Sequence, residues 1–362
     1  MNSSRPLQQH LNTAPQRPYY KNFFPDDNPA LDSVEQRNIR NQIAGNRTSH
    51  SQEEPIFASH EIDSVIKTLS NNKCPGLDGI DEKIIKQLHR IIPNFWTTLF
   101  NKCLLLGCFP KAWKVARVIP IPKADKTKLH SVAGYRGISL LSIPGKCLEK
   151  LLTQRLNYFL RSSGKIPQQQ YGFTEGKSTA DAIGEVTKFV RQSRQLGLKS
   201  CLVTLDISGA FDNAWHPGIL HILQKMNCPT NIYHILRDFL KDRSASITIG
   251  SAHSSKEITK SCPQGSVLGP TLWNILISDL IETLSTLQEV QTIIYADDIV
   301  LMFRGPSHPH ILTTLQDTLQ KTDNWCKEMK LEISKDKSAV MPMYIRKRAI
   351  YQQLQLLRGI SI

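Results

Sequence analysis

The sequence predicts an α+β fold in which helices flank an antiparallel sheet, and two observations support this class. Segments with helical periodicity are interleaved with paired β-type segments that are close enough in sequence to form hairpins. Regular strand–helix–strand repeats, which would favour a parallel sheet, are not evident. The chain has 362 residues and 40% of them are hydrophobic, so it can form one large or two medium domains with a buried core.

The N-terminal third is predicted to be helical after a polar arm. Residues 1–55 are rich in Asn, Gln, Ser, Pro and Arg and show little periodicity, so we expect a flexible arm. Apolar residues recur at helical spacing over 57–69, and the segment NNKCPGLDGI ends that helix with Asn, Pro and Gly. A second helix carries Ile84 and the apolar residues after it, and a third spans 95–106 and closes at Gly107.

The β-type segments follow. WKVARVIPIPK, residues 113–123, and CLVTLDISGAF predict strands, and SASITIG followed by KEIT predicts a hairpin. A helix is expected from Thr179, its candidate cap, to Gly197. VQTIIYADDIVLMF is the strongest hairpin pattern and places Asp297 and Asp298 at the turn, and LEISKDKSAVMPMY closes the sheet.

The charge balance favours a polyanionic partner. Lys and Arg total 45 against 31 Asp and Glu, which gives a net charge of +14. The excess is concentrated in residues 111–165, where only Asp125 and Glu149 oppose a run of basic side chains, so this block predicts a phosphate-facing surface. Its basic residues are Lys111, Lys114, Arg117, Lys123, Lys126, Lys128, Arg136, Lys146, Lys150, Arg155, Arg161 and Lys165.

The sequence lacks the apolar run of a signal peptide and any apolar stretch as long as a membrane span. We therefore expect an intracellular protein, in the cytoplasm, the nucleus or both, that is neither secreted nor membrane-bound. Eight cysteines are scattered without a C-x-x-C pair, so reduced and mostly buried thiols are predicted rather than disulfides or zinc ligands.

Three aspartates form the candidate catalytic group. Adjacent carboxylates at a hairpin tip repel each other, so Asp297 and Asp298 need a compensating cation or proton unless they form a solvent-exposed turn. Asp206 ends another apolar strand, and two neighbouring strands could aim all three carboxylates at one point. Mg²⁺ takes hard oxygen ligands, and a pair of such ions can activate a hydroxyl and stabilise a leaving phosphate oxygen. We therefore hypothesise a metal site.

LDISGAFDNAW, CPQGSVLGPTLWN, YADDIV and LEISKDKS occur in the order and spacing of a reverse transcriptase and closely resemble those of non-LTR retrotransposons of the jockey or LINE type. NNKCPGLDGI, WKVARVIPIPK, YRGISLL and QYGFTEGKSTADAI match upstream blocks, so the resemblance covers about residues 57–345. It implies an RNA-directed DNA polymerase, a nucleotidyltransferase that adds deoxynucleotides to a primer 3′-end by two-metal phosphoryl transfer in retrotransposition. The implied partners are an RNA template, a DNA primer and deoxynucleoside triphosphates.

The resemblance also implies a right-hand polymerase fold with an antiparallel palm sheet flanked by helices. N-terminal helices and fingers would span 56–165, the palm 166–345, and the start of an incomplete thumb or connection 346–362. The implied cofactor is Mg²⁺ as two ions, for which Mn²⁺ could substitute.

The family's metal-binding residues carry over to the aspartates. Asp206 and Asp297 would coordinate the catalytic ions, Asp298 would assist, and the Ile207 carbonyl would complete a metal shell.

Five further residues are implied to contact substrate. Lys123 and Arg136 would hold the incoming triphosphate, and Gln264 and Gly265 would line the nucleotide and template pocket. Lys337 would occupy the lysine position proposed to protonate pyrophosphate, with a solvated surface lysine as the alternative.

Phe211 lies five residues after Asp206, where this family keeps an aromatic residue against the sugar. A bulky ring there would clash with a ribose 2′-hydroxyl, so deoxynucleotides should be favoured. The alternative is an aromatic residue that fills the core.

The rival to an active enzyme is a catalytically inactive, truncated relic that acts at most as an RNA-binding module. Relatives normally carry an endonuclease before this region and a thumb after it, whereas about 50 polar residues precede it here and about 17 residues follow residue 345. The three intact carboxylates favour the enzyme.

Overall fold

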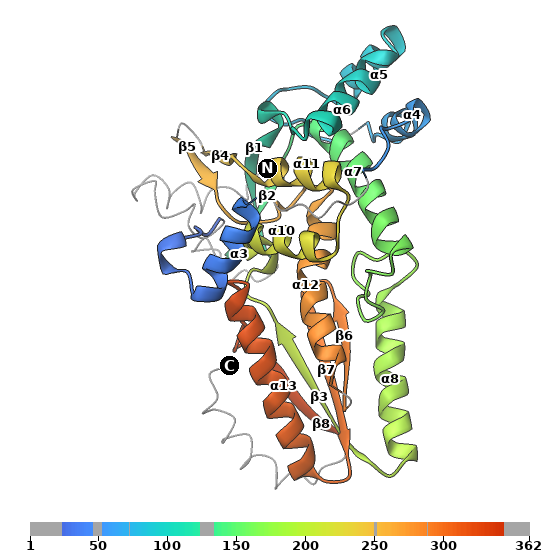
Figure 1. Cartoon of the computed structure of the whole chain (residues 1–362), viewed down its shortest axis with the longest axis vertical. Helices are drawn as coiled ribbons and strands as arrows, with labels where there is room; N and C mark the ends of the chain where they lie inside the picture. Colours follow the sequence, from blue (N-terminus) through green and yellow to red (C-terminus); the bar gives the residue numbers. More distant parts are fainter. Residues whose placement is uncertain are drawn as a thin grey trace. The chain divides into compact units, whose positions relative to one another are not determined.

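The computed structural model describes residues 24–45, 53–71, 73–123, 134–249, 252–287 and 289–343. It divides the chain into two compact units, each built from two separate stretches (Figure 1). The first unit contains Met1–Ser163 and Phe211–Leu272, and the second contains Gly164–Ala210 and Trp273–Ile362. The chain is thus grouped differently from the consecutive fingers and palm segments expected at 56–165 and 166–345, whose assignment stays a prediction. The expected thumb segment 346–362 lies outside the described residues.

The first unit contains a four-stranded sheet of order β2-β1-β4-β5. β1 (Val115–Pro122) pairs antiparallel with β2 (Tyr135–Leu140), as β4 (Arg243–Ile249) does with β5 (Ala252–Ile258). The predicted strand at 113–123 and the predicted hairpin are therefore confirmed. The pairing of β1 with β4 is parallel, so this sheet is mixed rather than purely antiparallel. Its core cluster consists of Phe24, Ala116, Val118, Tyr135, Leu141, Ala245, Ile247 and Ile258.

The first unit is otherwise mostly helical, and the three helices predicted over residues 57–106 are confirmed. Gly107 adopts a left-handed conformation with φ of 59° and ends the third of them, as expected. The helical elements of the unit are η1 (Pro29–Leu31), α3 (Val34–Ala44), α4 (Ser59–Lys67), α5 (Glu82–Ile91), α6 (Asn94–Leu106), η2 (Lys111–Lys114), α7 (Ile143–Ser162), α10 (His216–Lys225) and α11 (Thr230–Leu240). The chain passes from one unit to the other at three points: after Ser163, at the start of α9 (Ala210–Asn213) and after the first turn of α12 (Gly269–Ser285).

The expectation of a flexible arm is wrong for residues 24–45. Ser33 caps α3 through a reciprocal capping box with Gln36, and α3 packs against α10. Arg40 pairs with Asp27 at 2.6 Å and with Asp32 at 2.5 Å. A polar sequence can therefore be ordered here, because its charges are satisfied locally and its few apolar residues reach a core built by distant segments.

Some side chains of the basic block that was expected to face phosphate are instead used in ion pairs, and for the others phosphate contact stays a prediction. Lys114 is 4% exposed and pairs with Asp238 at 2.8 Å, and Arg155 pairs with Glu61 at 2.7 Å. These cations neutralise carboxylates that lie outside the block in sequence, so counting charges within the block overestimated its positive surface. The exposed basic residues of the block are Lys111, Arg117, Lys123, Arg136, Arg161 and Lys165, and Lys126 and Lys128 lie outside the described residues.

The second unit contains an antiparallel sheet of order β6-β7-β3-β8. β6 (Val290–Tyr295) and β7 (Asp298–Gly305) form the hairpin predicted around the paired aspartates. β3 (Lys199–Asp206) pairs with β7 and with β8 (Ala339–Met343), which closes the sheet as predicted.

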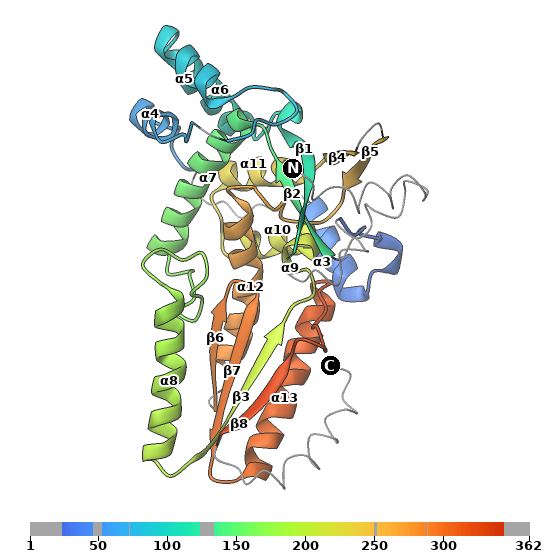
Figure 2. The same cartoon turned by 180° about the vertical axis from the view of Figure 1, so that it is seen from behind.

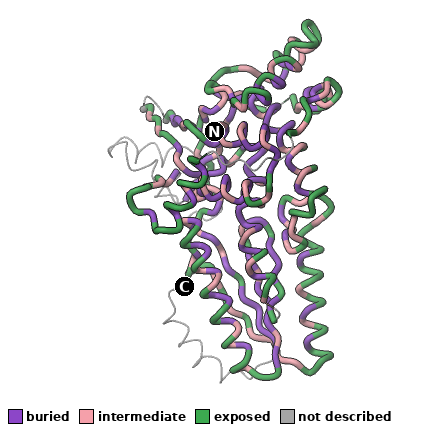
Figure 3. The backbone as a smooth tube through the Cα atoms, in the orientation of Figure 1, coloured by how far each residue is buried: buried purple, intermediate pink, exposed green. Residues whose placement is uncertain are grey.

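Helices cover both faces of this second sheet. In Figures 1 and 2, α12 and α13 (His308–Glu328) lie along one face, and α8 (Thr179–Gln195) lies on the other side next to β6. β3, β6 and β7 are largely buried along their length, whereas the edge strand β8 has only exposed and half-buried residues (Figure 3). α8 forms where a helix was predicted from Thr179, but its N-cap residue is Ser178. The Ser178 hydroxyl accepts from the backbone N–H of Asp181, and the Asp181 carboxylate accepts from the backbone N–H of Ser178.

The prediction that the cysteines are mostly buried is confirmed. All eight are free thiols, six of them are buried, and only Cys74 and Cys108 are exposed. Within the described residues, no helix combines the length and the apolar character that crossing a membrane would require.

One buried carboxylate holds the loop that precedes α12. Glu149 on α7 is 1% exposed, and its Oε2 accepts from the Ser266 hydroxyl at 2.5 Å and from the backbone N–H groups of Val267 at 2.7 Å and Leu268 at 3.2 Å. A carboxylate oxygen can accept several such bonds at once, whereas an amide placed there would weaken or lose them.

We expect Glu149→Gln to lower the free energy of unfolding by about 3 kcal/mol, because buried N–H and O–H donors lose a charged acceptor. Urea denaturation measures the change. Glu185→Gln is the control, because Glu185 forms an exposed ion pair with Lys188 on the surface of α8 at 3.3 Å, and it should shift stability by less than about 0.5 kcal/mol. Equal effects of the two substitutions would contradict this role for Glu149.

Candidate active site

Two of the predicted catalytic carboxylates face each other across adjacent strands. β3 ends at Asp206 and β7 begins at Asp298, and the two residues are directly paired in the antiparallel register. Directly paired residues project from the same face of a sheet. The register therefore places both carboxylates on one face at one end of the strand pair.

Asp297 belongs to the β6–β7 turn, whose backbone is held by contacts from outside the hairpin. The preceding residue, Ala296, has φ of 59°, a conformation that residues with a side chain seldom adopt. Gln170 Oε1 accepts from the Ala296 N–H at 3.3 Å, and Trp273 Nε1 donates to the Ala296 carbonyl at 2.9 Å. Gly172 packs on this turn so closely that a Cβ atom there would lie 2.1 Å from the Ala296 nitrogen.

The carboxylates are electrostatically coupled. Burial raises the pKa of Asp297, and the charges of Asp298 and Asp206 raise it further. Burial and the charge of Asp206 likewise raise the pKa of Asp298. Lys337 opposes both shifts, and its Nζ lies 3.0 Å from Asp206 Oδ1.

Asp206, Asp297 and Asp298 have the oxygen ligands that a hard divalent cation requires. Their carboxylates share one end of the sheet, and their mutual repulsion raises two pKa values, so an added cation would relieve it. As placed, no three Asp, Glu, His or Cys side chains among the described residues are grouped closely enough to hold an ion, and Lys337 is the cation in contact with Asp206. Ile207 is buried and forms an isolated bridge with Ile333.

The residues implied to contact the triphosphate lie in the first unit, on one hairpin. Arg136 on β2 is directly paired with Ile121 on β1, and Lys123 follows Ile121 by two residues. Because side chains alternate along a strand, Arg136 and Lys123 lie on the same side of the hairpin. Both are exposed. The structure thus brings together these two predicted residues.

Phe211, Gln264 and Gly265 are also brought together in the first unit. The Phe211 carbonyl accepts from the Cys262 N–H at 2.7 Å, and the Gln264 carbonyl accepts from the Ser139 N–H of β2 at 2.8 Å. Gly265 has φ of 118°, and a Cβ atom there would lie 2.5 Å from the Ser139 carbonyl oxygen. This position therefore requires glycine for both conformation and space.

Sequence reasoning missed the residues that support these groups. Gln170 and Trp273 hold the Asp297 turn. Both lie within motif segments, QYGF and LGPTLWN, and this position is the sequence feature that could have identified them. Asp212, next to Phe211 in LDISGAFD, accepts from Gln264 Nε2 at 3.2 and 3.3 Å. Burial raises the pKa of Asp212 to about 6, although the Gln264 bond and the charge of Lys123 act to lower it.

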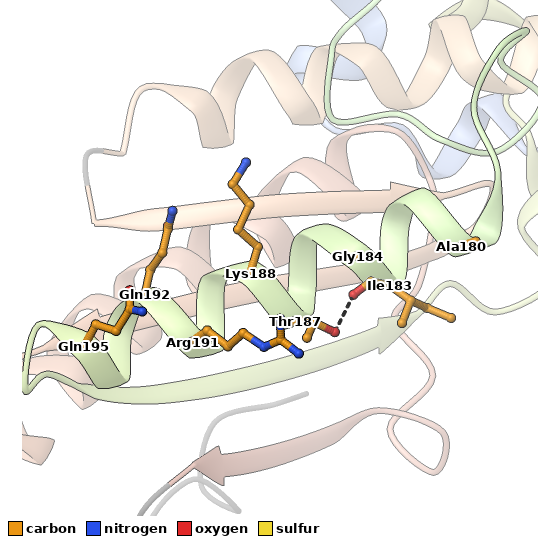
Figure 4. Close-up of a pocket in the computed structure, with 8 residues that line it drawn as sticks. All are labelled: Ala180, Ile183, Gly184, Thr187, Lys188, Arg191, Gln192 and Gln195. Atoms are coloured by element: carbon orange, nitrogen blue, oxygen red, sulfur yellow. Dashed lines mark hydrogen bonds between the residues drawn. The ribbon is translucent and has the colours of Figure 1, made fainter.

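The outward face of α8 carries a shallow depression of about 640 Å³ (Figure 4). None of the predicted site residues lines it. Lys188 and Arg191 extend from it in different directions. The lining residues are Ala180, Ile183, Gly184, Thr187, Lys188, Arg191, Gln192 and Gln195.

Comparison with known proteins decides the family. The family model of the reverse transcriptase (RNA-dependent DNA polymerase) matches residues 121–351, which is more than half of the chain. The chain belongs to the reverse transcriptase family.

Similar proteins are encoded by non-LTR elements. The chain is 33% identical over 284 residues to the RNA-directed DNA polymerase from mobile element jockey of Drosophila melanogaster, covering 77% of this chain and 31% of that protein. It is 31% identical to the probable RNA-directed DNA polymerase from transposon BS of the same species, with the same coverage. The chain thus spans about a third of the length of these curated relatives.

A solved structure also shares the fold. The chain matches apo telomerase from Candida tropicalis, truncated from its C-terminal domain, with a TM-score of 0.51 and 12% identity. The match covers 74% of this chain and 56% of the other. The predicted fold class, an α+β right-hand polymerase with fingers and an antiparallel palm sheet flanked by helices, is confirmed.

The raised pKa of Asp212 predicts a pH-dependent difference in stability. Because the folded-state pKa of about 6 lies above the ordinary value of 3.8, Asp212 stabilises the fold below pH 4, and this contribution is lost as the pH rises through 6. The unfolding free energy of the wild type should therefore fall relative to that of Asp212→Asn by up to about 3 kcal/mol between pH 4 and 7. Urea denaturation across this range measures it, and a difference that is independent of pH would contradict the assigned shift.

Proposed function

We propose that this chain is an RNA-directed DNA polymerase domain that adds deoxynucleotides to a DNA primer on an RNA template, in retrotransposition. The observation that carries the proposal is the direct pairing of Asp206 with Asp298 beside the constrained Asp297 turn. Family membership and similarity to the polymerases of jockey-type elements support the same reaction.

The carboxylates supply the metal ligands in this proposal. Asp206, Asp297 and Asp298 would hold Mg²⁺, with the Ile207 carbonyl as a further ligand. When bound, two such ions activate the primer hydroxyl and stabilise the leaving phosphate oxygen. Strand pairing and the buried turn fix the ligands before substrate arrives, which lowers the cost of ordering them. Lys337, 3.0 Å from Asp206, would protonate the pyrophosphate.

The substrate-contacting residues form the second part. Arg136 and Lys123, on the same exposed side of the β1–β2 hairpin, would bind the anionic triphosphate. Gln264 and Gly265 would line the nucleotide and template pocket, where the absence of a side chain at Gly265 lets its backbone approach β2. The fixed charges of the hairpin would orient the triphosphate.

Single-nucleotide primer extension on an RNA template, with Mg²⁺ and purified protein, tests this function. We expect Asp206→Asn to reduce kcat by about 10³-fold or more, because it removes a metal ligand whose effect is worth several kcal/mol. Asp317→Asn on α13 is the matched control, because Asp317 forms an exposed ion pair with Lys321 on the helix surface, and it should retain activity. If the wild type binds RNA but incorporates no nucleotide, the relic with RNA binding alone replaces the polymerase.

Sugar selection tests the role of Phe211. Its side chain is only half-buried, so it is available to a substrate as well as to the core. We expect Phe211→Val to reduce the preference for a deoxynucleotide over its ribonucleotide, because the smaller side chain leaves room for the 2′-hydroxyl. The ratio of the two kcat/KM values on an RNA template measures the preference. A ratio that the substitution leaves unchanged would assign Phe211 to the core alone.

A further inference from the structure

Asp212 and Gln264 join two segments of the first unit that carry predicted substrate residues, Phe211 on one and Gln264 and Gly265 on the other. Backbone bonds run from the Ser261 N–H to the Ala214 carbonyl at 2.9 Å and from the Cys262 N–H to the Phe211 carbonyl at 2.7 Å. These bonds hold residues 211–214 beside residues 261–264. The side chains then meet, with Gln264 Nε2 at 3.2 and 3.3 Å from the two Asp212 oxygens.

The backbone of Gln264 is fixed on its other side. Its carbonyl accepts from the Ser139 N–H, and Gly265 after it occupies a conformation and a space that other residues cannot enter. Glu149 anchors the next residues through Ser266 and Val267. The backbone of Gln264 is thus held on both sides, and among the described residues Asp212 is the group that its side-chain amide contacts.

The chemistry of Asp212 sets this orientation. An ionised carboxylate has only acceptor atoms, so it must face the amide nitrogen of Gln264 and leave the amide oxygen outward. Among the described residues, the structure records no partner for Gln264 Oε1. Gln264 thus presents an acceptor rather than a donor to whatever enters its pocket.

We propose that Asp212 is a positioning residue that orients the Gln264 amide so that its oxygen accepts a hydrogen bond from the incoming deoxynucleotide. The inference rests on the proposed polymerase function. It assigns Asp212 no contact with substrate, and it makes the ligand group a hydroxyl or N–H donor of the nucleotide. Asn at position 212 would present both a donor and an acceptor, and the Gln264 amide could then bind it in either orientation.

A double-mutant cycle on nucleotide incorporation tests the proposal. We expect Asp212→Asn to raise KM for the deoxynucleotide about tenfold with kcat changed less than about twofold, because the Gln264 amide can then turn its oxygen inward and lose its hydrogen bond to the nucleotide. Gln264→Ala should have a similar effect, and the double variant should be no worse than Gln264→Ala alone, because Asp212 acts only through Gln264. Additive effects, or an unchanged KM in Asp212→Asn, would overturn it.

Asp238→Asn is the matched control in the same unit. Asp238 accepts from the Phe109 N–H at 2.7 Å and from Lys114 Nζ at 2.8 Å, so its loss tests what a purely structural carboxylate does. The control should lower Tm while leaving KM unchanged. If it raises KM as much as Asp212→Asn does, the Asp212 effect is one of general stability and the proposal fails.

A measurement without turnover separates this inference from the polymerase itself. The side-chain amide resonance of Gln264, in protein with ¹⁵N-labelled glutamine and assigned by its loss in Gln264→Ala, should shift with a midpoint near pH 6. Among the described residues, Lys123 and Cys262 are the other titratable groups that interact electrostatically with Asp212. The shift should vanish in Asp212→Asn and persist in Lys123→Met, which would assign the titration to Asp212 rather than to Lys123. A resonance that ignores Asp212 overturns the inference even in an active enzyme. If the wild type incorporates no nucleotide, the proposed function is refuted. The titration still decides in that case whether Asp212 orients Gln264.

Discussion

The pairing of β3 with β7 is the constraint on which the catalytic end of the second unit depends. Its register places Asp206 opposite Asp298, an arrangement of like charges that disfavours strand pairing by itself. The rest of the ladder offsets this repulsion, because Val203, Leu205, Ile299 and Leu301 are each at most 2% exposed. A slip of one residue would move this apolar set to the other face, so burial of the core also fixes the position of the carboxylates.

The same unit constrains its turn from outside the hairpin. Ala296 keeps its left-handed conformation because Gln170, Gly172 and Trp273 contact it, and none of these residues lies in β6 or β7. Two carboxylates with raised pKa values are thus held on a backbone that has little freedom to separate them. A rigid site with several carboxylates is suited to binding cations, and the Lys337 side chain places a positive charge next to Asp206.

In the first unit, the loop over residues 261–268 is likewise held by contacts from outside it. The loop is bound by β2 through Ser139, by the segment after β3 through Phe211 and Asp212, and by α7 through Glu149. Each anchor belongs to a different stretch of sequence. The loop therefore holds Gln264 and Gly265 in place only when these elements have already packed, which ties the formation of the pocket to the formation of the core.

Local patterns in the sequence determined the elements: Gly107 ended a helix, and the apolar runs around Asp297 formed a hairpin, because periodicity and turn chemistry act over a few residues. The motifs indicated the family and identified the three aspartates as candidate catalytic residues. Tertiary structure alone decided that Arg155 neutralises Glu61 instead of facing phosphate, that residues 24–45 are ordered, and that Asp212 meets Gln264 across 52 positions of sequence. The reason is physical: partners and burial are set by which distant segments pack together, and neither composition nor periodicity encodes that choice.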